Sequence, residues 1–93
     1  MDGGGDNQER LAAPAPAPLF APPVKRSVTI AGHQTAISLE PLFWEALRDH
    51  AQRLNLPVNA LIARIDAARL AADDPPNLAS ALRCWLFAPE RRL

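Results

Sequence analysis

Polar and apolar residues alternate between positions 27 and 39. Ser27-Val28-Thr29-Ile30 alternates, Ala31-Gly32-His33 has the composition of a turn, and residues 34–39 alternate again. A period of two with many β-branched residues predicts extended strands. Two alternatives remain open: the whole stretch is one hairpin, or only its second half is a regular strand.

Successive side chains of a strand point to opposite faces of a sheet. One face of the second half is expected to lie on a core, and it carries Thr35, Ile37 and Leu39. The other face is expected to meet solvent or a ligand, and it carries Gln34, Ala36 and Ser38.

A first helix is predicted to begin at Pro41, because a proline at the first helical position has no N–H to leave unsatisfied. It is predicted to end at Asn55, since Leu56-Pro57 opposes continuation. Its apolar residues recur at three- and four-residue spacing and form one stripe: Phe43, Leu47, Ala51 and Leu54.

Two further helices follow. The second is predicted from about Pro57 to Ala72, and its inward residues are Val58, Leu61, Ile62, Ile65 and either Ala68 or Arg69. The third is short, with Asn77 as its N-cap and Pro89 as its end. Its inward residues are Leu78, Ala81, Leu82, Trp85 and Leu86. We expect Trp44 and Trp85 to pack in the core or where the third helix docks.

The chain divides by composition into three parts. Residues 1–24 are rich in Gly, Ala and Pro and are predicted to be a disordered tail. Residues 25–89 are predicted to form one domain that is mainly α with a short β-ribbon, and residues 90–93 a short tail.

A folded domain of roughly 70 residues buries a modest fraction of its surface, so we expect a disulfide, a metal ion or a second chain to stabilise it. Cys84 is the only cysteine, expected as a small core residue, so no disulfide can form within the chain. His33 and His50 are isolated, and no metal-binding spacing occurs. We therefore expect a homodimer in which the ribbon pairs with its copy; a monomeric hairpin on three helices is the alternative.

The predicted dimer core combines the inward strand residues with apolar residues of the first two helices. It consists of Thr35, Ile37, Leu39, Phe43, Leu47, Leu61, Ile62 and Ile65.

Charge and composition narrow the function. The chain has 10 Lys and Arg against 10 Asp and Glu, but no acidic residue lies between Lys25 and Leu39. No apolar run approaches the roughly 18 residues of a membrane span, and the acidic N-terminus does not resemble a secretion signal. With a lone thiol, this predicts a cytoplasmic protein. No catalytic residue set stands out, so we expect neither an enzyme nor a cofactor or metal.

An alternating strand, a Glu-Pro helix start and an Asn-Leu-Pro-Val-Asn turn between two helices resemble the ribbon-helix-helix family of bacterial DNA-binding proteins. A sub-family of short, mostly uncharacterised proteins is similar over residues 25–87. The segments that carry this resemblance are KRSVTIAGH (25–33), TAISLE (35–40), FWEAL (43–47), NALI (59–62) and NLASALR (77–83).

The resemblance implies an intertwined homodimer whose paired strands lie in the DNA major groove. It implies base contacts from Gln34, Ala36 and Ser38, and phosphate contacts from the backbone N–H groups of Val58 and Asn59. Ala36 can only touch a thymine methyl. Pro57, where the family usually has Ser or Thr, has no N–H to add.

Lys25, Arg26 and His33 are the further candidates for phosphate contacts, because no acidic residue lies near them in the sequence. The function implied is a sequence-specific DNA-binding protein that regulates transcription. The alternative is a protein-interaction or antitoxin-like adaptor, whose protein partner would bind the N-terminal tail or the third helix.

Overall fold

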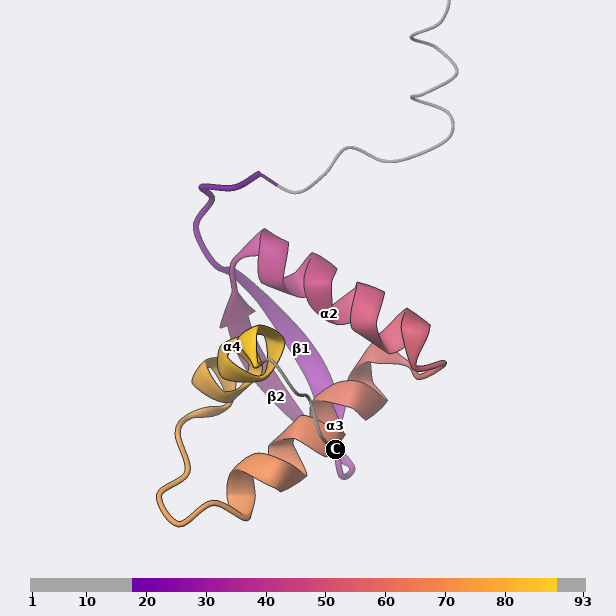
Figure 1. Cartoon of the computed structure of the whole chain (residues 1–93), viewed down its shortest axis with the longest axis vertical. Helices are drawn as coiled ribbons and strands as arrows, with labels where there is room; N and C mark the ends of the chain where they lie inside the picture. The colour runs from indigo at the N-terminus through magenta and orange to yellow at the C-terminus, as the bar shows by residue number, and fades with distance from the viewer. Residues whose placement is uncertain (1–17, 89–93) are drawn as a thin grey trace, which may run out of the picture.

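The computed structural model of the chain describes residues 18–88, which form a two-stranded ribbon followed by three helices (Figure 1). The predicted order of elements is confirmed. Of the predicted tail of residues 1–24, residues 1–17 lie outside the described residues. The predicted tail of residues 90–93 lies outside them entirely.

The ribbon is a hairpin within one chain. Strand β1 (Val24–Ile30) runs antiparallel to β2 (His33–Leu39), in a register that pairs Val24 with Leu39 and Ile30 with His33. The two residues between the strands both have positive φ, 52° at Ala31 and 81° at Gly32. Two positive φ values are typical of a two-residue turn that matches strand twist. The one-hairpin alternative is therefore confirmed, and the alternative with only one regular strand is wrong.

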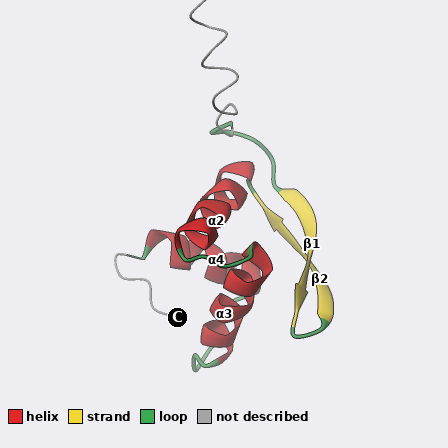
Figure 2. Ribbon diagram, turned by 90° about the vertical axis from the view of Figure 1, so that its right-hand side faces the viewer, coloured by secondary structure: helices red, strands yellow, loops and turns green. Residues whose placement is uncertain are grey.

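All three helices lie on the same side of the ribbon (Figure 2). They are α2 (Pro41–Arg53), α3 (Val58–Leu70) and α4 (Leu78–Phe87). The core lies between the ribbon and the helices and is built mainly from aliphatic side chains. Its buried residues are Val28, Ile37, Leu39, Trp44, Leu47, Ala51, Leu61, Ile62, Ile65, Leu82 and Leu86.

Helix α2 ends as the sequence predicts. Asn55 adopts the left-handed conformation with φ 62°, which asparagine tolerates better than most residues. The N–H of Leu56 donates to the carbonyl of Ala51 at 2.9 Å, and the N–H of Asn55 donates to that of Gln52 at 3.1 Å. These two bonds form a Schellman motif, which turns the chain sharply into α3.

The predicted stripe of α2 is confirmed at Leu47 and Ala51, is partly buried against the core at Phe43, and is wrong at Leu54. Trp44 is buried with 3% of its surface exposed, whereas Phe43 is only half-buried and Leu54 is 47% exposed. The indole Nε1–H of Trp44 donates to the carbonyl of Val24 at 2.9 Å, which holds the ring against the start of β1. Leu54 lies beyond the last helical residue, as the C-cap. The core role expected for Trp44 is confirmed.

Helix α3 buries Leu61, Ile62 and Ile65 as expected, but it ends at Leu70, two residues before the predicted end at Ala72. Pro57 is its N-cap and not its first helical residue.

Helix α4 has the predicted cap, because Asn77 Oδ1 accepts a hydrogen bond from the Ser80 N–H at 2.8 Å. Its predicted end at Pro89 lies outside the described residues. Leu82 and Leu86 are buried, whereas Cys84 is exposed, so its expected core position is wrong. The reason is helical geometry: a residue midway between two positions four apart points away from their face.

One side chain of α4 fastens it to the beginning of α2. The guanidinium of Arg83 donates to Glu40 Oε1 at 2.9 Å and lies 5.5 Å from the ring centroid of Phe43. The hydrogen bond from the backbone N–H of Glu40 to its own carboxylate, together with that from Arg83, lowers the pKa of the Glu40 carboxyl. The third helix thus closes the end of the core where the chain leaves the ribbon.

No helix within residues 18–88 has the length and apolar character to span a membrane. In the same part of the chain, no cluster of three or more His, Cys, Asp or Glu side chains is arranged to hold a metal ion.

Candidate nucleic-acid interface

The hairpin has two faces of opposite character. Residues directly opposite each other in an antiparallel pair project from the same face, so the register assigns every side chain. We call the face turned away from the helices the outer face: it pairs Lys25 with Ser38, Ser27 with Ala36, and Thr29 with Gln34. The remaining strand residues form the inner face, which includes the buried Val28, Ile37 and Leu39.

All six side chains of the outer face are exposed. They comprise hydroxyls, one amide, one ammonium and one methyl, and none carries a negative charge. Such a surface offers donors and acceptors without repelling an anion. The three residues predicted to read bases, Gln34, Ala36 and Ser38, do lie together on this face, and their contact with bases stays a prediction.

Ser27 and Thr29 share the outer face, although the sequence pattern did not assign them to the interface. The signal was present, because residues 27–30 alternate in the same way as residues 34–39. What was missing was the pairing of the two halves within one chain. The structure supplies that pairing by placing Ser27 opposite Ala36 and Thr29 opposite Gln34.

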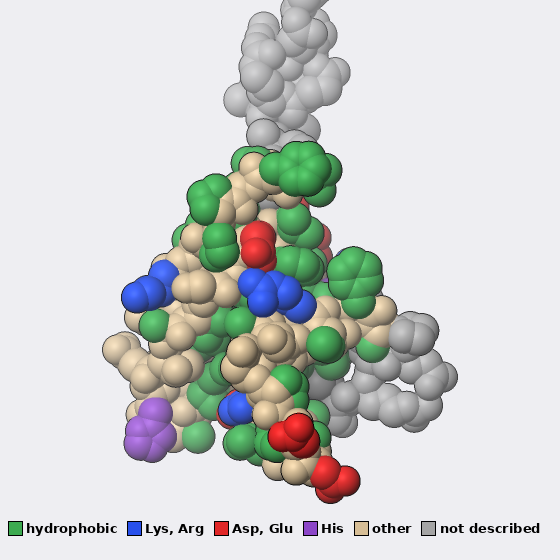
Figure 3. All heavy atoms as spheres, turned by 90° about the vertical axis from the view of Figure 1, so that its left-hand side faces the viewer, with side chains coloured by type: hydrophobic (Ala, Val, Ile, Leu, Met, Phe, Trp, Pro, Cys, Tyr) green, Lys and Arg blue, Asp and Glu red, His purple; other side chains and the backbone are tan. Residues whose placement is uncertain are grey.

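The basic residues at the start of β1 are split between the faces. Lys25 is on the outer face, whereas Arg26 is on the inner face with its guanidinium 5.6 Å from the centroid of the Trp44 ring. Such a distance permits a cation–π interaction. Both side chains remain exposed, as does that of His33 at the turn. The face in Figure 3 shows basic side chains at separate places rather than in one continuous patch.

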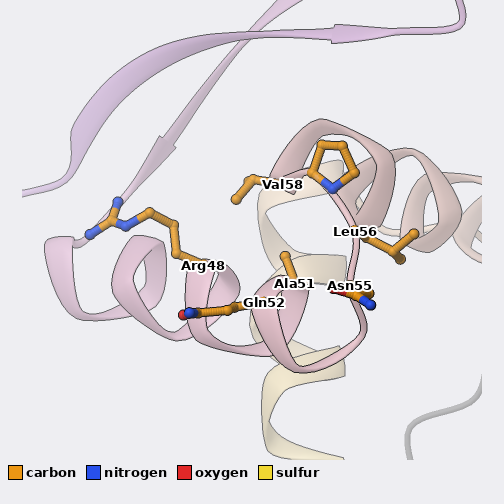
Figure 4. A pocket seen from close by; sticks show the side chains of 7 residues that line it. Arg48, Ala51, Gln52, Asn55, Leu56 and Val58 are labelled. Carbon is orange, nitrogen blue, oxygen red and sulfur yellow. The ribbon is translucent and has the colours of Figure 1, made fainter.

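The start of α3 offers the second predicted contact. The N–H groups of Ala60 and Leu61 both donate to the carbonyl of Pro57. Those of Val58 and Asn59 have no hydrogen-bond acceptor within residues 18–88. Unpaired amides at a helix N-terminus favour an anion. They adjoin an open groove of about 440 Å³ at the corner of α2 and α3, bordered by Arg48, Ala51 and Val58 among others (Figure 4).

Six of the eight residues predicted for a dimer core are already buried within one chain. They are Ile37, Leu39, Leu47, Leu61, Ile62 and Ile65. Thr35 is exposed and Phe43 is half-buried. The burial of the six therefore does not require a second copy, and the dimer core stays a prediction.

Strand β2 has a free edge. The sheet within residues 18–88 has only two strands, so β2 is paired with β1 on one side alone. Along β2, residues 35–38 and residues 77–79 at the start of α4 line a groove of about 290 Å³. The free edge retains unpaired backbone groups that can pair with another strand, and the groove leaves Thr35 exposed.

A family model described as a ribbon-helix-helix domain matches residues 23–89. Proteins with this domain are broadly DNA-binding transcription regulators or antitoxins; they generally form dimers and are typically not enzymes. Comparisons with curated proteins and with solved structures found no match for the chain.

Proposed function

The chain belongs to the ribbon-helix-helix domain family, and from that premise we propose that it is a sequence-specific DNA-binding protein of the cytoplasm that regulates transcription. The observation that carries the proposal is the outer face of the hairpin, which is exposed along its whole length and free of acidic side chains. A two-stranded ribbon has the width that the DNA major groove admits.

Base recognition would rest on the polar side chains of β2. Gln34 can bind the N6 and N7 atoms of an adenine with its amide group, and Ser38 can donate to or accept from a base edge. Ala36 can contribute only contact with a thymine methyl group. The outer face therefore favours a site that contains A·T pairs.

The phosphate contacts would be few. We propose Lys25 beside the ribbon and the N–H groups of Val58 and Asn59 at the start of α3, with Arg26 and His33 near the strand ends. Because each cationic contact adds to the salt dependence of binding, we expect a shallow dependence on salt and a modest intrinsic affinity.

We propose that the protein acts as a homodimer. The support is the free edge of β2, together with the exposed Thr35 and half-buried Phe43 that border the core. A light-scattering mass of two chains is the expected result, and a mass of one chain across the micromolar range would contradict it.

The test of DNA binding begins with selection of duplexes from a random library by the full chain. Fluorescence anisotropy on a selected duplex is then compared between the wild type and Gln34→Ala. A bidentate pair with a base is worth about 1–3 kcal/mol, so we expect affinity to fall by roughly 5- to 150-fold. Ser80→Ala, which lies on α4 and not on the outer face of the hairpin, serves as the control. Equal affinity of the wild type for all duplexes would refute the proposal.

A charge substitution tests the backbone interactions separately. Lys25→Ala should weaken binding to all duplexes alike, and it should reduce the slope of log affinity against log salt by about 1, because one cation leaves the phosphate backbone. Arg53→Ala removes the same charge from the exposed end of α2 and is expected to leave the slope unchanged. Equal slopes for Lys25→Ala and the wild type would exclude Lys25 from the interface.

Exposed aromatic residues favour a second candidate function, an adaptor that binds a protein. Phe20 before the ribbon is 92% exposed, and Phe87 at the end of α4 is 81% exposed. Large apolar side chains at the surface are typical of protein contact sites. A stoichiometric protein partner that binds the wild type but not Phe87→Ala or Phe20→Ala, in the absence of nucleic acid, would support this candidate.

A further inference from the structure

We propose that the turn end of the hairpin, together with α3 and the start of α4, forms a binding site for an aliphatic α-amino acid in its zwitterionic form. The site is a pocket of about 240 Å³ on the inner side of the hairpin, apart from the outer face. Its lining residues are Ile30, His33, Thr35, Asp66, Arg69 and Leu78. The binding of an amino acid goes beyond the proposed function and can be tested without DNA.

The pocket has walls from three parts of the fold. Ile30 and His33 are the pair next to the turn, and both belong to the inner face of the hairpin. Asp66 and Arg69 lie three residues apart on α3 and therefore on the same side of that helix. Leu78 is the first residue of α4. The packing of the hairpin, α3 and α4 thus brings these side chains to one place.

The charged groups of the pocket cancel each other. Asp66 Oδ1 accepts two hydrogen bonds from the Arg69 guanidinium, from Nη2 at 2.7 Å and from Nε at 3.0 Å. Both side chains are largely buried, with 15% of Asp66 and 20% of Arg69 exposed. A ligand with a net charge would lose water here without gaining a matching opposite charge. The pocket therefore favours a ligand whose own charges also cancel.

The ion pair leaves hydrogen-bonding capacity unused on both of its members. Asp66 Oδ2 accepts no hydrogen bond from residues 18–88. Arg69 donates two hydrogen bonds to Asp66 and one to the carbonyl of Pro76 at 3.0 Å, and a guanidinium has further N–H groups to donate. An ammonium can therefore donate to Asp66 while a carboxylate accepts from Arg69. An α-amino acid carries these two groups side by side.

The other lining residues determine which amino acid fits. His33 and Thr35 add an imidazole and a hydroxyl, and neither side chain makes a hydrogen bond within residues 18–88. Ile30 and Leu78 are half-buried against the core and offer apolar surface to an aliphatic side chain. The pocket has the volume of about eight water molecules, at about 30 Å³ each. This volume suits an amino acid better than a nucleotide.

The site is compatible with the proposed homodimer. Pairing along the free edge of β2 uses the backbone groups of that strand, whereas the site uses side chains of the inner face. The groove beside the edge shares only Thr35 and Leu78 with the site. A dimer formed through this edge therefore does not require the groups of the ion pair.

A bound amino acid would act on the outer face through β2. Gln34 lies between His33 and Thr35 in the strand and points to the outer face. A ligand held by the hairpin and α3 together restricts the motion of the hairpin end that presents Gln34, so less conformational entropy is lost when DNA binds. We expect the bound amino acid to raise DNA affinity by at least about 5-fold. This coupling, unlike the site, rests on the proposed function.

The first experiment measures binding to the full chain without DNA. The common α-amino acids are screened for a rise in the midpoint of thermal unfolding, and those that raise it are measured by isothermal titration calorimetry. L-leucine is compared with N-acetyl-L-leucine, which lacks the ammonium, and with L-leucine methyl ester, which lacks the carboxylate. We expect the aliphatic amino acids to bind and each derivative to bind at least about 10-fold more weakly than L-leucine, because each loses a charged hydrogen bond.

Two variants place the binding in this pocket. Asp66→Asn removes the charge that holds the ammonium, and it also weakens the bond to Arg69 within the fold. His33→Glu adds a negative charge at an exposed position, where it repels the carboxylate without disturbing the core. Each variant should bind at least about 10-fold more weakly. Asp49→Asn, on the exposed side of α2, is the matched control and should bind as the wild type does. Circular dichroism checks the fold of each variant.

A second experiment measures the affinity for a selected duplex with and without a saturating concentration of the tightest-binding amino acid. An unchanged DNA affinity would overturn the coupling and leave the site standing. A wild type that binds the amino acid but selects no duplex would overturn the proposed function and the coupling, but not the site.

Two results would overturn the site itself. One is the absence of binding for every amino acid screened. The other is binding that Asp66→Asn and His33→Glu both leave unchanged, because the amino acid would then be held elsewhere on the chain. Equal affinity for L-leucine and its two derivatives would likewise exclude recognition of a zwitterion.

Discussion

The inner and outer faces of the hairpin are built from the same two strands, and they differ in almost every physical respect. The inner face buries Val28, Ile37 and Leu39 against three helices, with 5% or less of each side chain exposed. The outer face exposes six small or polar side chains, and only Lys25 among them carries a charge. Because side chains alternate along a strand, each residue either faces the core or faces solvent, and not both.

The difference teaches where stability and recognition reside. Free energy from apolar burial comes from the inner face, at roughly 25 cal/mol for each Å² removed from water. The outer face contributes little of this kind, so its residues can change without unfolding the domain. The proposed DNA-binding surface could therefore change in specificity while the fold is kept.

The largest expected effect is on the inner face. Leu39 is fully buried, so Leu39→Ala should lower the free energy of unfolding by about 2–5 kcal/mol through lost burial and a cavity. Its neighbour Ser38 points to the opposite face, and Ser38→Ala should change stability by no more than about 0.5 kcal/mol. Urea denaturation followed by circular dichroism measures both. Similar losses for the two variants would end the distinction between the faces.

A smaller effect is expected where the inner face is tied to α2 by one hydrogen bond. Trp44→Phe keeps an aromatic ring but removes the Nε1–H that donates to the Val24 carbonyl. We expect a loss of about 1–3 kcal/mol, because a part-buried acceptor loses its partner and some volume is vacated. Amide hydrogen exchange should rise first at β1. Unchanged protection there would mean that the indole N–H does not hold the strand.

The sequence predicted the elements better than it predicted the faces of the helices. Period two and the turn composition located the second strand and left open whether residues 27–30 form the first. Pro41, Asn55 and Asn77 located helix ends because each acts through its own backbone chemistry. The choice of Trp44 over Phe43 for the core depended on a hydrogen bond to residue 24, which no local pattern contains.

The residues of the candidate site were likewise predicted only in part. Gln34, Ala36 and Ser38 were placed on one face by alternation alone. Ser27 and Thr29 were missed, and Arg26 was grouped with Lys25, because both assignments require knowing that β1 pairs with β2 of the same chain. Pairing partners are set by tertiary structure, which spacing along the chain does not specify.

The turn that joins the strands offers a third test, since it fixes the register on which both faces depend. Gly32 has φ +81° and open space around it, so Gly32→Ala should cost about 1–2 kcal/mol from backbone strain and not from a clash. Ala31→Asn should stabilise the hairpin by up to about 1 kcal/mol, because asparagine accepts a positive φ more readily. Thermal unfolding of the two variants should shift in opposite directions. Shifts in the same direction would contradict the turn conformation.

The smallest expected effect concerns the ion pair between Glu40, before α2, and Arg83 of α4. The pKa of the Glu40 carboxyl is lowered in the folded chain, chiefly by the hydrogen bond from its own backbone N–H and then by the one from Arg83. A lowered pKa means that the stabilisation is fully present above the ordinary value of 4.5 and is lost as the pH falls through the lowered folded value. The urea midpoint of the wild type should therefore exceed that of Glu40→Gln at neutral pH, and the difference between the two midpoints should disappear as the pH falls below 4.5 and through the lowered folded pKa. Because both side chains remain partly exposed to solvent, the difference should be the smallest of the four effects.

A matched substitution on α2 separates the charge of Glu40 from its packing. The Glu45 carboxylate has no ion-pair partner within residues 18–88, so Glu45→Gln, which removes one carboxylate without breaking an ion pair, serves as the control. A difference for Glu40→Gln that persists undiminished in acid would assign the contribution of Glu40 to packing and not to its charge.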